Sequence, residues 1–304
     1  MTLLDFYGLR EQPFSPTPDP RFLYPSPSHR EIAAALLQGI ESGCGFLTLI
    51  ARPGMGKTSL LFNLLDELKG RARTAFLFQT RCTEREFVQY VAEDLGVANA
   101  NGNLATLHAR LNQLLVQEAE AGRRVVLVID EAHNLSEPVL EMARMLTNFE
   151  TPERKLLQIV LAGQPQLATI LARPSMAQLL QRITILRQLA PLSAQEVQEF
   201  INYRLRVAGH AGDPPFSLDT MLLIAEASRG IPRLVNEICF SSLTRGYATK
   251  RRTIDRQMMR EVLAGLSLSS LLREMLPKPI RKTRKPLVSV SRLPSLLRNL
   301  KLLH

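Results

Sequence analysis

Short apolar runs alternate with amphipathic segments over about the first 190 residues of the chain. Phe46–Ile50 and residues 125–129 are two such runs, and the second is rich in β-branched residues and too short for a free-standing helix, which predicts a strand buried on both faces. Further strands are expected over residues 74–79, 156–162 and 183–189, with helices over 28–41, 59–68, 84–95, 104–121, 138–147 and 166–171. This alternation predicts an α/β fold in which helices cover a parallel sheet.

After Pro191 the pattern changes to helices alone. The capping box of Ser193 and Glu196 marks the first helix, and others follow over residues 219–227, 232–249 and 255–266. We therefore expect an α/β core over residues 28–190, a small all-helical lid domain over 191–268 and a basic, flexible tail over 269–304 that begins with one more short apolar helix.

The first 27 residues are rich in proline and aromatic side chains, which excludes a regular helix. We expect them to wrap over the core as extended chain. The helix that follows is predicted to begin at Ser28 as its N-cap, with Glu31 as the capping-box partner.

Residues 51–58 read Ala-Arg-Pro-Gly-Met-Gly-Lys-Thr directly behind the first strand, and predict a phosphate-binding loop. Gly54 and Gly56 let successive backbone N–H groups point at an anion. Lys57 brings a positive charge to the β- and γ-phosphates, and Thr58 offers a hydroxyl to Mg²⁺. The pattern usually opens with glycine, and Ala51 fits there if its φ stays negative.

The strand over residues 125–129 ends in Asp130, Glu131, Ala132 and His133. A carboxylate at such a strand end, beside the phosphate loop, can hold Mg²⁺, and the next one can orient and polarise the attacking water. We assign Asp130 to Mg²⁺, together with Thr58, and Glu131 to the water. The expected Mg-ATP-binding residues are Pro53, Gly54, Met55, Gly56, Lys57, Thr58, Ser59 and Asp130.

The same four residues occur in helicases. A helicase of that type needs a second motor domain, and too little chain follows Glu131 for one. His133 is therefore interpreted as a local polar residue.

Composition adds one asymmetry, because the formal net charge of +10 is concentrated in the tail. No acidic residue follows Glu274, and eight basic residues do, which leaves a charge of +2 for the rest of the chain. The eight are Lys278, Arg281, Lys282, Arg284, Lys285, Arg292, Arg298 and Lys301. Such a tail is typical of a segment that binds DNA, of one that binds an anionic membrane surface or of a solvated extension.

Other features exclude several classes of protein. No apolar stretch approaches the roughly 20 residues that a membrane-spanning helix needs. Asp5 and Pro13 do not fit a secretion signal, so we expect a cytoplasmic protein, which includes a position at the inner face of the membrane. The three cysteines, Cys44, Cys82 and Cys239, form no pair or metal motif and are expected to be reduced.

These motifs in this order resemble those of the AAA+ ATPases, and the match extends to a narrower family. Residues 6–14 (Phe-Tyr-Gly-Leu-Arg-Glu-Gln-Pro-Phe) are similar to the ATPase A components of bacterial general secretion (the ExeA type), as are residues 18–24, 29–30, 161–165, 181–183 and 230–236. The resemblance covers about residues 4–266. Transposition helper ATPases share much of this core.

The resemblance implies roles for further residues. Gln164 follows the fourth core strand, where a polar sensor contacts the γ-phosphate or the water, although it could instead cap the next helix. Arg233 opens a lid helix, where a second sensor is expected, or is a surface residue. Arg182 lies where a neighbouring subunit's arginine finger is expected, or pairs with an acid, and Arg187 is the second choice. Phe22, Leu23 and Tyr24 either flank adenine or pack in the core.

Three functions follow from this reading. The first is Mg-dependent ATP hydrolysis at the interfaces of a homo-oligomer, driving conformational change in secretion or cell-envelope assembly. The alternative is an ATP-switched, DNA-binding helper of a transposase, which the basic tail slightly favours. A scaffold that rarely turns ATP over is the third, and the complete set of Lys57, Asp130 and Glu131 argues against it.

Overall fold

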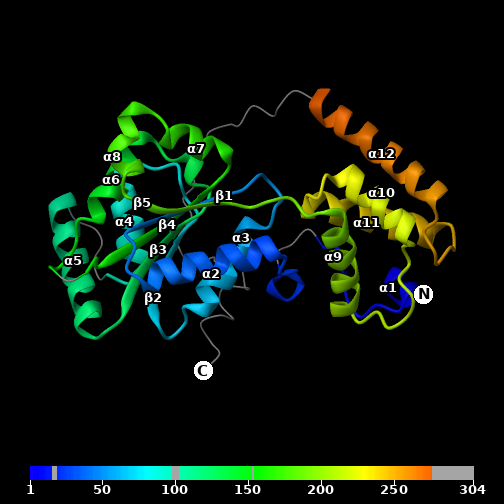
Figure 1. Ribbon diagram of the computed structural model, residues 1–304, viewed down its shortest axis with the longest axis horizontal. Coiled ribbons are helices and arrows are strands. Elements are labelled where there is room, and N and C mark those ends of the chain that lie inside the picture. Colours follow the sequence, from blue (N-terminus) through cyan, green and yellow to red (C-terminus); the bar gives the residue numbers. More distant parts are fainter. Residues whose placement is uncertain (16–18, 98–102, 153, 276–304) are drawn as a thin grey trace. The chain divides into compact units, whose positions relative to one another are not determined.

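A parallel sheet organises residues 46–188 in the computed structural model, which describes residues 1–15, 19–97, 103–152 and 154–275 (Figure 1). In the described chain five strands pair in the order β2-β3-β4-β1-β5. Their bounds are β1 Phe46–Ile50, β2 Ala72–Leu77, β3 Arg124–Ile129, β4 Leu157–Gly163 and β5 Ile183–Gln188. All five predicted strands are present, which confirms the α/β fold class.

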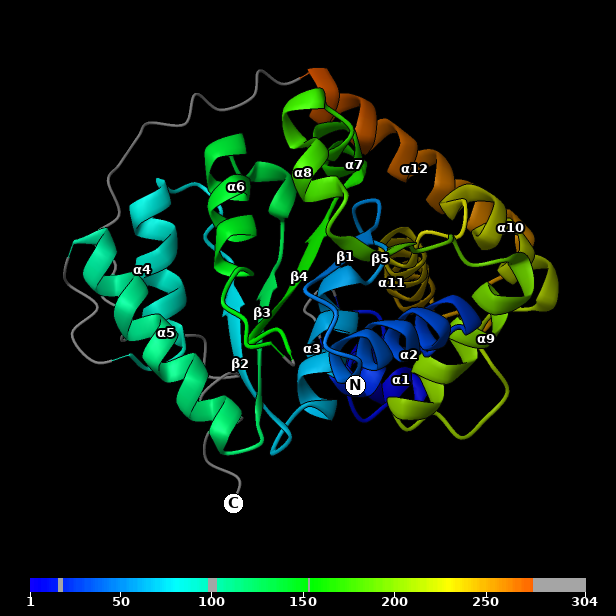
Figure 2. The ribbon, with the colours of Figure 1, turned by 60° about the vertical axis from the view of Figure 1, so that its left-hand side comes forward.

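Helices cover both faces of this sheet (Figure 2). One face packs against α2 (Pro27–Glu41) and α3 (Lys57–Glu67). The other packs against α4 Glu84–Asp94, α5 Leu104–Glu120, α6 Glu137–Leu146, α7 Pro165–Leu171 and α8 Ala177–Leu180. Strand β1 shows why its run is apolar throughout, since Leu47 and Leu49 face α2 and α3 while Phe46 and Ile50 face the other layer.

Only helices follow β5 in the part of the chain that the structure describes. They are α9 Ala194–Val207, α10 Leu218–Ser228, α11 Pro232–Ala248 and α12 Arg256–Met275. We call residues 193–264, which contain α9, α10, α11 and the first part of α12, the helical region, and it belongs to the same compact unit as the sheet, Met1–Ala264. The predicted capping box of Ser193 and Glu196 is present at the start of α9.

The end of α12 differs from the prediction of one helix to residue 266 and another beyond 269. One uninterrupted helix runs to Met275, since no proline occurs between Arg256 and Met275 and the single glycine, Gly265, is tolerated. The basic residues from Lys278 to Lys301 lie outside the described residues. None of the described helices is both long enough and apolar enough to cross a membrane.

The prediction that residues 1–27 are extended and lie over the core is wrong in two respects. The segment contains α1 (Leu3–Tyr7) and a 3₁₀ turn, η1 (Pro20–Phe22), and a capping box of Thr2 and Asp5 starts α1 well before the first proline, Pro13. It also lies largely against the helical region. The Arg10 N–H donates to the Ala208 carbonyl at 2.8 Å, and Phe14 meets Phe216 edge to face.

The start of α2 also differs from the prediction. Its N-cap is Ser26, whose hydroxyl accepts a hydrogen bond from the His29 N–H. Pro27 explains the shift, because proline lacks an N–H and is well suited to the first helical position. The hydroxyl of Ser28, the predicted cap, instead accepts a hydrogen bond from the Ala190 N–H at 3.3 Å.

Gly230 joins the helical region to the chain that leaves the sheet. It has φ of 69°, and its carbonyl accepts a hydrogen bond from the Leu192 N–H at 2.9 Å. A Cβ added at Gly230 would lie 2.0 Å from the Leu192 carbonyl oxygen, which is backbone and cannot rotate away. Glycine is thus required here by both conformation and space.

We expect Gly230→Ala to lower the free energy of unfolding by about 3 kcal/mol or more, since left-handed strain of about 1–2 kcal/mol adds to a steric clash. Gly70→Ala is the matched control, because Gly70 has φ of 72° but no atom within 4 Å of the added Cβ, so only the strain applies. Denaturant unfolding of both variants measures the difference. Equal losses would contradict the proposed backbone contact.

Candidate nucleotide-binding site

Two glycines with positive φ shape the loop between β1 and α3. Gly54 has φ of 80° and Gly56 has φ of 88°. A Cβ on Gly54 would lie 2.6 Å from Arg233 Cβ, and Gly56 is the N-cap of α3, so that Lys57 opens the helix. Ala51 is not among the residues with positive φ, which agrees with the expectation that alanine fits this position only without a positive φ. The predicted loop is therefore present, and it lies against the start of α11.

The ammonium group of Lys57 lies between two carboxylates that follow β3. Its Nζ contacts Asp130 Oδ1 and donates to Glu131 Oε1 at 2.8 Å. Lys57 and Asp130 are both buried, so water screens their attraction little. Burial lowers the pKa of Lys57, although the hydrogen bond and charge of Glu131 act in the opposite direction. The sequence-predicted set of Lys57, Asp130 and Glu131 is thus brought together.

Thr58 and Asp130 form a pair of hard oxygen ligands beside this lysine. Thr58 Oγ1 donates to Asp130 Oδ2 at 2.6 Å. Mg²⁺ is commonly held by one or two protein oxygens of this kind, with water and phosphate oxygens completing its shell. The two residues therefore fit the predicted metal role. The described residues contain no cluster of three or more acidic, histidine or cysteine side chains suited to a metal ion.

Glu131 has an unusual backbone and a well-defined side chain. Its φ of 53° is uncommon for a residue other than glycine. Its Oε2 accepts a hydrogen bond from Gln164 Nε2 at 3.2 Å and lies 3.5 Å from His133 Nε2. Burial by itself raises the pKa of Glu131, but the hydrogen bond and charge of Lys57 outweigh it and leave the pKa lowered. The carboxylate is therefore ionised, as a base must be.

Gln164 and His133 support Glu131 together. Gln164 is the N-cap of α7, but its side chain makes no capping hydrogen bond, so the alternative of a plain helix cap is not what the structure contains. His133 Nδ1 accepts from the Gln164 N–H at 3.3 Å, which puts the imidazole proton on Nε2, facing Glu131. Burial lowers the pKa of His133 and keeps the ring neutral near pH 7. His133, read from the sequence as a local polar residue, thus contacts the predicted base.

A cleft of about 320 Å³ opens beside the loop. It is lined by loop residues together with Glu131, Gln164 and Arg233. Leu192 and side chains from the N-terminal segment and the helical region also line it: Asp19, Phe22, Leu23, Tyr24, Phe200, Arg204 and Asn236. Phe22, Leu23 and Tyr24 therefore face the cleft, and the first of them is also packed into the interior.

Arg204 joins the N-terminal segment to α9, and sequence reasoning missed it. The side chain is 8% exposed, and it donates from Nε to the Pro13 carbonyl at 2.6 Å and from Nη1 to the Phe22 carbonyl at 3.2 Å. Its guanidinium lies 5.0 Å from the centroid of the Phe22 ring and 5.4 Å from that of Phe200. Burial lowers the pKa of Arg204 to about 10.

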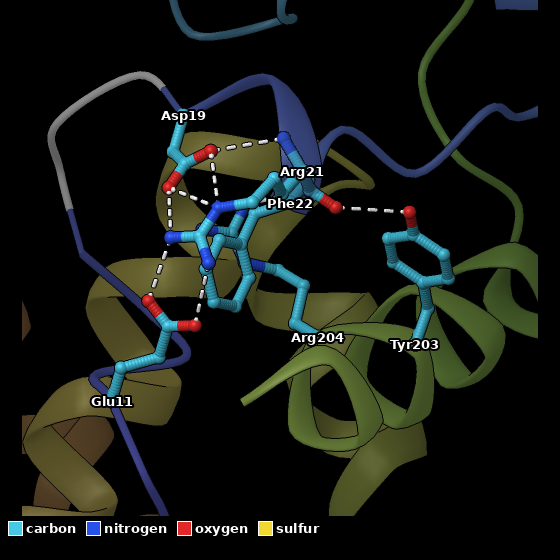
Figure 3. A network of polar contacts seen from close by, with 6 residues as sticks. All are labelled: Glu11, Asp19, Arg21, Phe22, Tyr203 and Arg204. Carbon is cyan, nitrogen blue, oxygen red and sulfur yellow. Dashed lines mark hydrogen bonds and ion pairs between the residues drawn. The ribbon is translucent and has the colours of Figure 1, made fainter. Parts of the chain in front are cut away.

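Arg21 fixes the same segment from outside (Figure 3). Its guanidinium donates to both oxygens of Glu11, at 2.9 and 2.8 Å, and to Asp19 at 2.6 Å. The Arg21 carbonyl accepts from the Tyr203 hydroxyl on α9 at 3.0 Å. These contacts hold the Phe22 wall of the cleft against the helical region.

His29 contacts the phosphate loop, which its local pattern did not predict, although residues 29–30 are among those that carry the family resemblance. It is buried, and its Nε2 lies 3.2 Å from the carbonyl oxygen of Met55 in the phosphate loop. A carbonyl only accepts, so Nε2 carries the proton and Nδ1 accepts from the Ser26 hydroxyl at 2.7 Å. His29 thus supports the loop from below.

The three candidate arginines occupy different places. Arg233 lines the cleft, and its backbone N–H donates to the Gly54 carbonyl at 3.1 Å. Arg182 lies outside the lining of the cleft and donates to Asn148 Oδ1 at 2.6 Å, rather than pairing with an acid. Arg187 is exposed on β5.

Comparisons with known proteins agree with this geometry. A family profile described as "AAA domain" matches residues 40–171. The chain is 39% identical over 244 residues to "General secretion pathway protein A" of Aeromonas hydrophila, which covers 80% of this chain. The match spans 44% of the length of that relative.

Solved structures show the same fold at low sequence identity. The ORC2 protein of Aeropyrum pernix, in ADPNP–ADP complexes, matches with a TM-score of 0.63 at 14% identity, covering 84% of this chain and 71% of that one. Cdc6p of Pyrobaculum aerophilum matches with a TM-score of 0.61 at 22% identity, over 87% and 74%. The RuvB branch migration motor of Thermotoga maritima matches with 0.55 at 19% identity, over 84% and 74%.

The profile match spans the phosphate loop and the paired carboxylates, and the relative matches over most of the chain. The chain thus contains an AAA ATPase domain and is related to General secretion pathway protein A.

Proposed function

We propose that the protein is an ATP-driven switch that binds Mg-ATP, assembles with copies of itself and serves secretion or cell-envelope assembly at the inner face of the membrane. The observation that carries this proposal is the position of Glu131, held between Lys57 and Gln164 at the mouth of the phosphate loop. The relationship to General secretion pathway protein A supports the choice of pathway.

Phosphate binding changes the partners of Lys57. The triphosphate brings several negative charges to the loop, and these compete with Asp130 and Glu131 for the ammonium group. Once Lys57 turns toward the phosphates, Glu131 Oε1 loses that partner and becomes free to accept a hydrogen bond from water. The site is therefore arranged so that ATP itself releases the base.

Hydrolysis then needs little covalent chemistry from the protein. A water oxygen attacks the γ-phosphorus, the bond to the ADP oxygen breaks, and Glu131 accepts or orients the proton that the water gives up. Lys57, Gln164 and Arg233 supply fixed donors for the charge that spreads over the transferred group. Mg²⁺, held by Thr58 and Asp130, would neutralise phosphate charge when bound.

Arg182 is proposed to act on the site of a neighbouring copy. In its own chain it does not line the cleft, and within the described residues its side chain donates hydrogen bonds to the neutral side chains of Asn148 and Thr147. Its charge contributes to the lowered pKa values of Glu141 and Glu150, but it forms no ion pair with an acid in the described part of the chain. An arginine supplied in trans stabilises the transition state of phosphoryl transfer in other P-loop enzymes.

The basic tail favours a second candidate function, an ATP-switched helper that binds DNA for a transposase. Eight cations without an acid follow Glu274, and such clusters release counterions when they meet a phosphate backbone. An anionic membrane surface offers similar charges.

Glu131→Gln is expected to reduce ATP turnover about 100-fold or more while ATP still binds, because the amide keeps the shape but cannot accept the proton. Lys57→Ala is expected to lose both ATP turnover and ATP binding. Glu137→Gln is the control, since Glu137 pairs with Arg173 outside the cleft. Phosphate release and equilibrium ATP binding measure both effects, and wild-type turnover in Glu131→Gln would exclude Glu131 as the base.

If Arg182 acts in trans, Arg182→Ala and Glu131→Gln proteins, each inactive, should regain part of the activity when mixed. One mixed interface then has an intact Glu131 facing an intact Arg182. ATPase activity per subunit should also rise with the concentration of the wild-type protein. Arg173→Ala serves as a control that stays active alone. A rate per subunit that does not change between dilute and concentrated protein would rule the trans role out.

Replacing the eight basic residues after Glu274 by glutamine should leave ATP binding intact, because all residues that line the cleft precede them. Binding to duplex DNA or to anionic vesicles should weaken and lose its salt dependence, whose slope is about −0.9 per DNA phosphate neutralised. Binding to DNA alone would favour the helper, and binding to vesicles alone would favour secretion. Unchanged affinities and slopes would mean that the tail contacts neither.

A further inference from the structure

One polar side chain in the wall of the cleft has no hydrogen-bond partner within the described residues. Asn236 lines the cleft, and its Oδ1 is buried with no donor in reach. Burying an amide oxygen without a partner is costly, and native proteins rarely leave such a group unsatisfied. An orphaned acceptor in the wall of a ligand site indicates that the ligand supplies the donor.

Several other polar groups of the cleft already have partners within the protein. The Tyr24 hydroxyl donates to Glu199 Oε2 at 2.5 Å, and Asp19 accepts from Arg21. Arg204 donates to the two carbonyls of the N-terminal segment, and His29 donates to Met55. Asn236 is therefore the side chain whose buried oxygen is left for a bound molecule.

The position of Asn236 selects the part of the nucleotide that it meets. Arg233, whose N–H bonds to Gly54, lies at the phosphate loop, and Asn236 follows three residues later on the same face of α11. It lines the same cleft as the apolar side chains of Phe22, Leu23 and Phe200. Apolar side chains suit a purine ring, whereas Lys57 of the phosphate loop supplies charge for the phosphates.

The chemistry of the amide matches adenine. Adenine presents an amino donor beside a ring-nitrogen acceptor, and an asparagine amide presents the complementary acceptor and donor in one plane. A 6-oxo purine has a carbonyl in place of that amino group, which would face Asn236 Oδ1 as a second acceptor. The buried oxygen would then remain unsatisfied, and discrimination by hydrogen-bonding sites arises in this way.

We infer that Asn236 determines base specificity, accepting a hydrogen bond through Oδ1 from the 6-amino group of ATP. The inference rests on the proposed ATP binding, and goes beyond it by assigning the selection of the base to a single side chain of α11.

The first test changes the ligand and leaves the full-length protein intact. Binding of ATP, inosine triphosphate (a carbonyl at position 6) and purine riboside triphosphate (hydrogen at position 6) is measured by calorimetry with Mg²⁺. We expect ATP to bind roughly 5- to 100-fold more tightly than either analogue, the range typical of one good amide–base contact. Equal affinities for ATP and purine riboside triphosphate would overturn the inference.

The second test changes the protein. Asn236→Leu should reduce the affinity for ATP to about that for purine riboside triphosphate, while the affinity for the analogue stays nearly unchanged. Asn202→Leu is the matched control, because Asn202 on α9 also has a buried Oδ1 without a partner but does not line the cleft, so it should keep the wild-type preference. A parallel loss for ATP and the analogue in Asn236→Leu would place the contact on the ribose or phosphates and overturn the inference.

The outcomes separate this inference from the proposed function. A wild-type protein that binds none of the three triphosphates would refute the ATPase proposal itself. A wild-type protein that binds all three equally, and hydrolyses ATP, would refute only the role of Asn236.

Discussion

The buried ammonium group of Lys57 requires a compensating negative charge, and the arrangement of the sheet supplies it. Lys57 follows β1, whereas Asp130 and Glu131 follow β3, and β4 lies between these two strands. Parallel pairing places all three strand ends at one edge, so residues more than 70 positions apart meet there. Without the carboxylates, the lysine would be an unpaired buried charge, which proteins tolerate poorly. The same pairing prepares the site for phosphate, which can take the place of the carboxylates.

A second level of organisation surrounds this centre. The loop touches α11 through Gly54 and Arg233 and touches α2 through His29. The remaining wall is built by the N-terminal segment, which Arg204 and Arg21 fasten to α9. The cleft thus has one side that belongs to the sheet and another that belongs to the helical region. Interactions far from the phosphates consequently determine its shape.

The strands and the phosphate loop were predicted well from the sequence, and the walls of the cleft around them poorly, for physical reasons. Strand runs and the loop are local patterns, because buried parallel strands must be apolar and glycine must occupy positions with positive φ. The placement of residues 1–27 depends on which apolar surface their aromatic side chains meet, and no local pattern encodes that.

Arg204 and Asn236 were missed for a related reason. Each lies on an amphipathic helix at a position that sequence periodicity treats as ordinary, and only the packing of α9 and α11 around the cleft buries Arg204 and the side-chain oxygen of Asn236. The N-cap of α2 was misplaced by two residues, because Ser26 and Ser28 are both suitable caps and Pro27 decides between them. The roles proposed for Gln164, Arg182 and Arg233 stay predictions.

The hydrogen bond from the Arg233 N–H to the Gly54 carbonyl joins the phosphate loop to the first turn of α11. If ATP favours one orientation of α11 by a given free energy, a protein that binds the helical region only in that orientation raises the affinity for ATP by the same free energy. ATP must in turn raise the affinity for that protein equally. Measuring nucleotide affinity with and without a captured partner would therefore report the strength of their coupling, even where no structure of the complex exists.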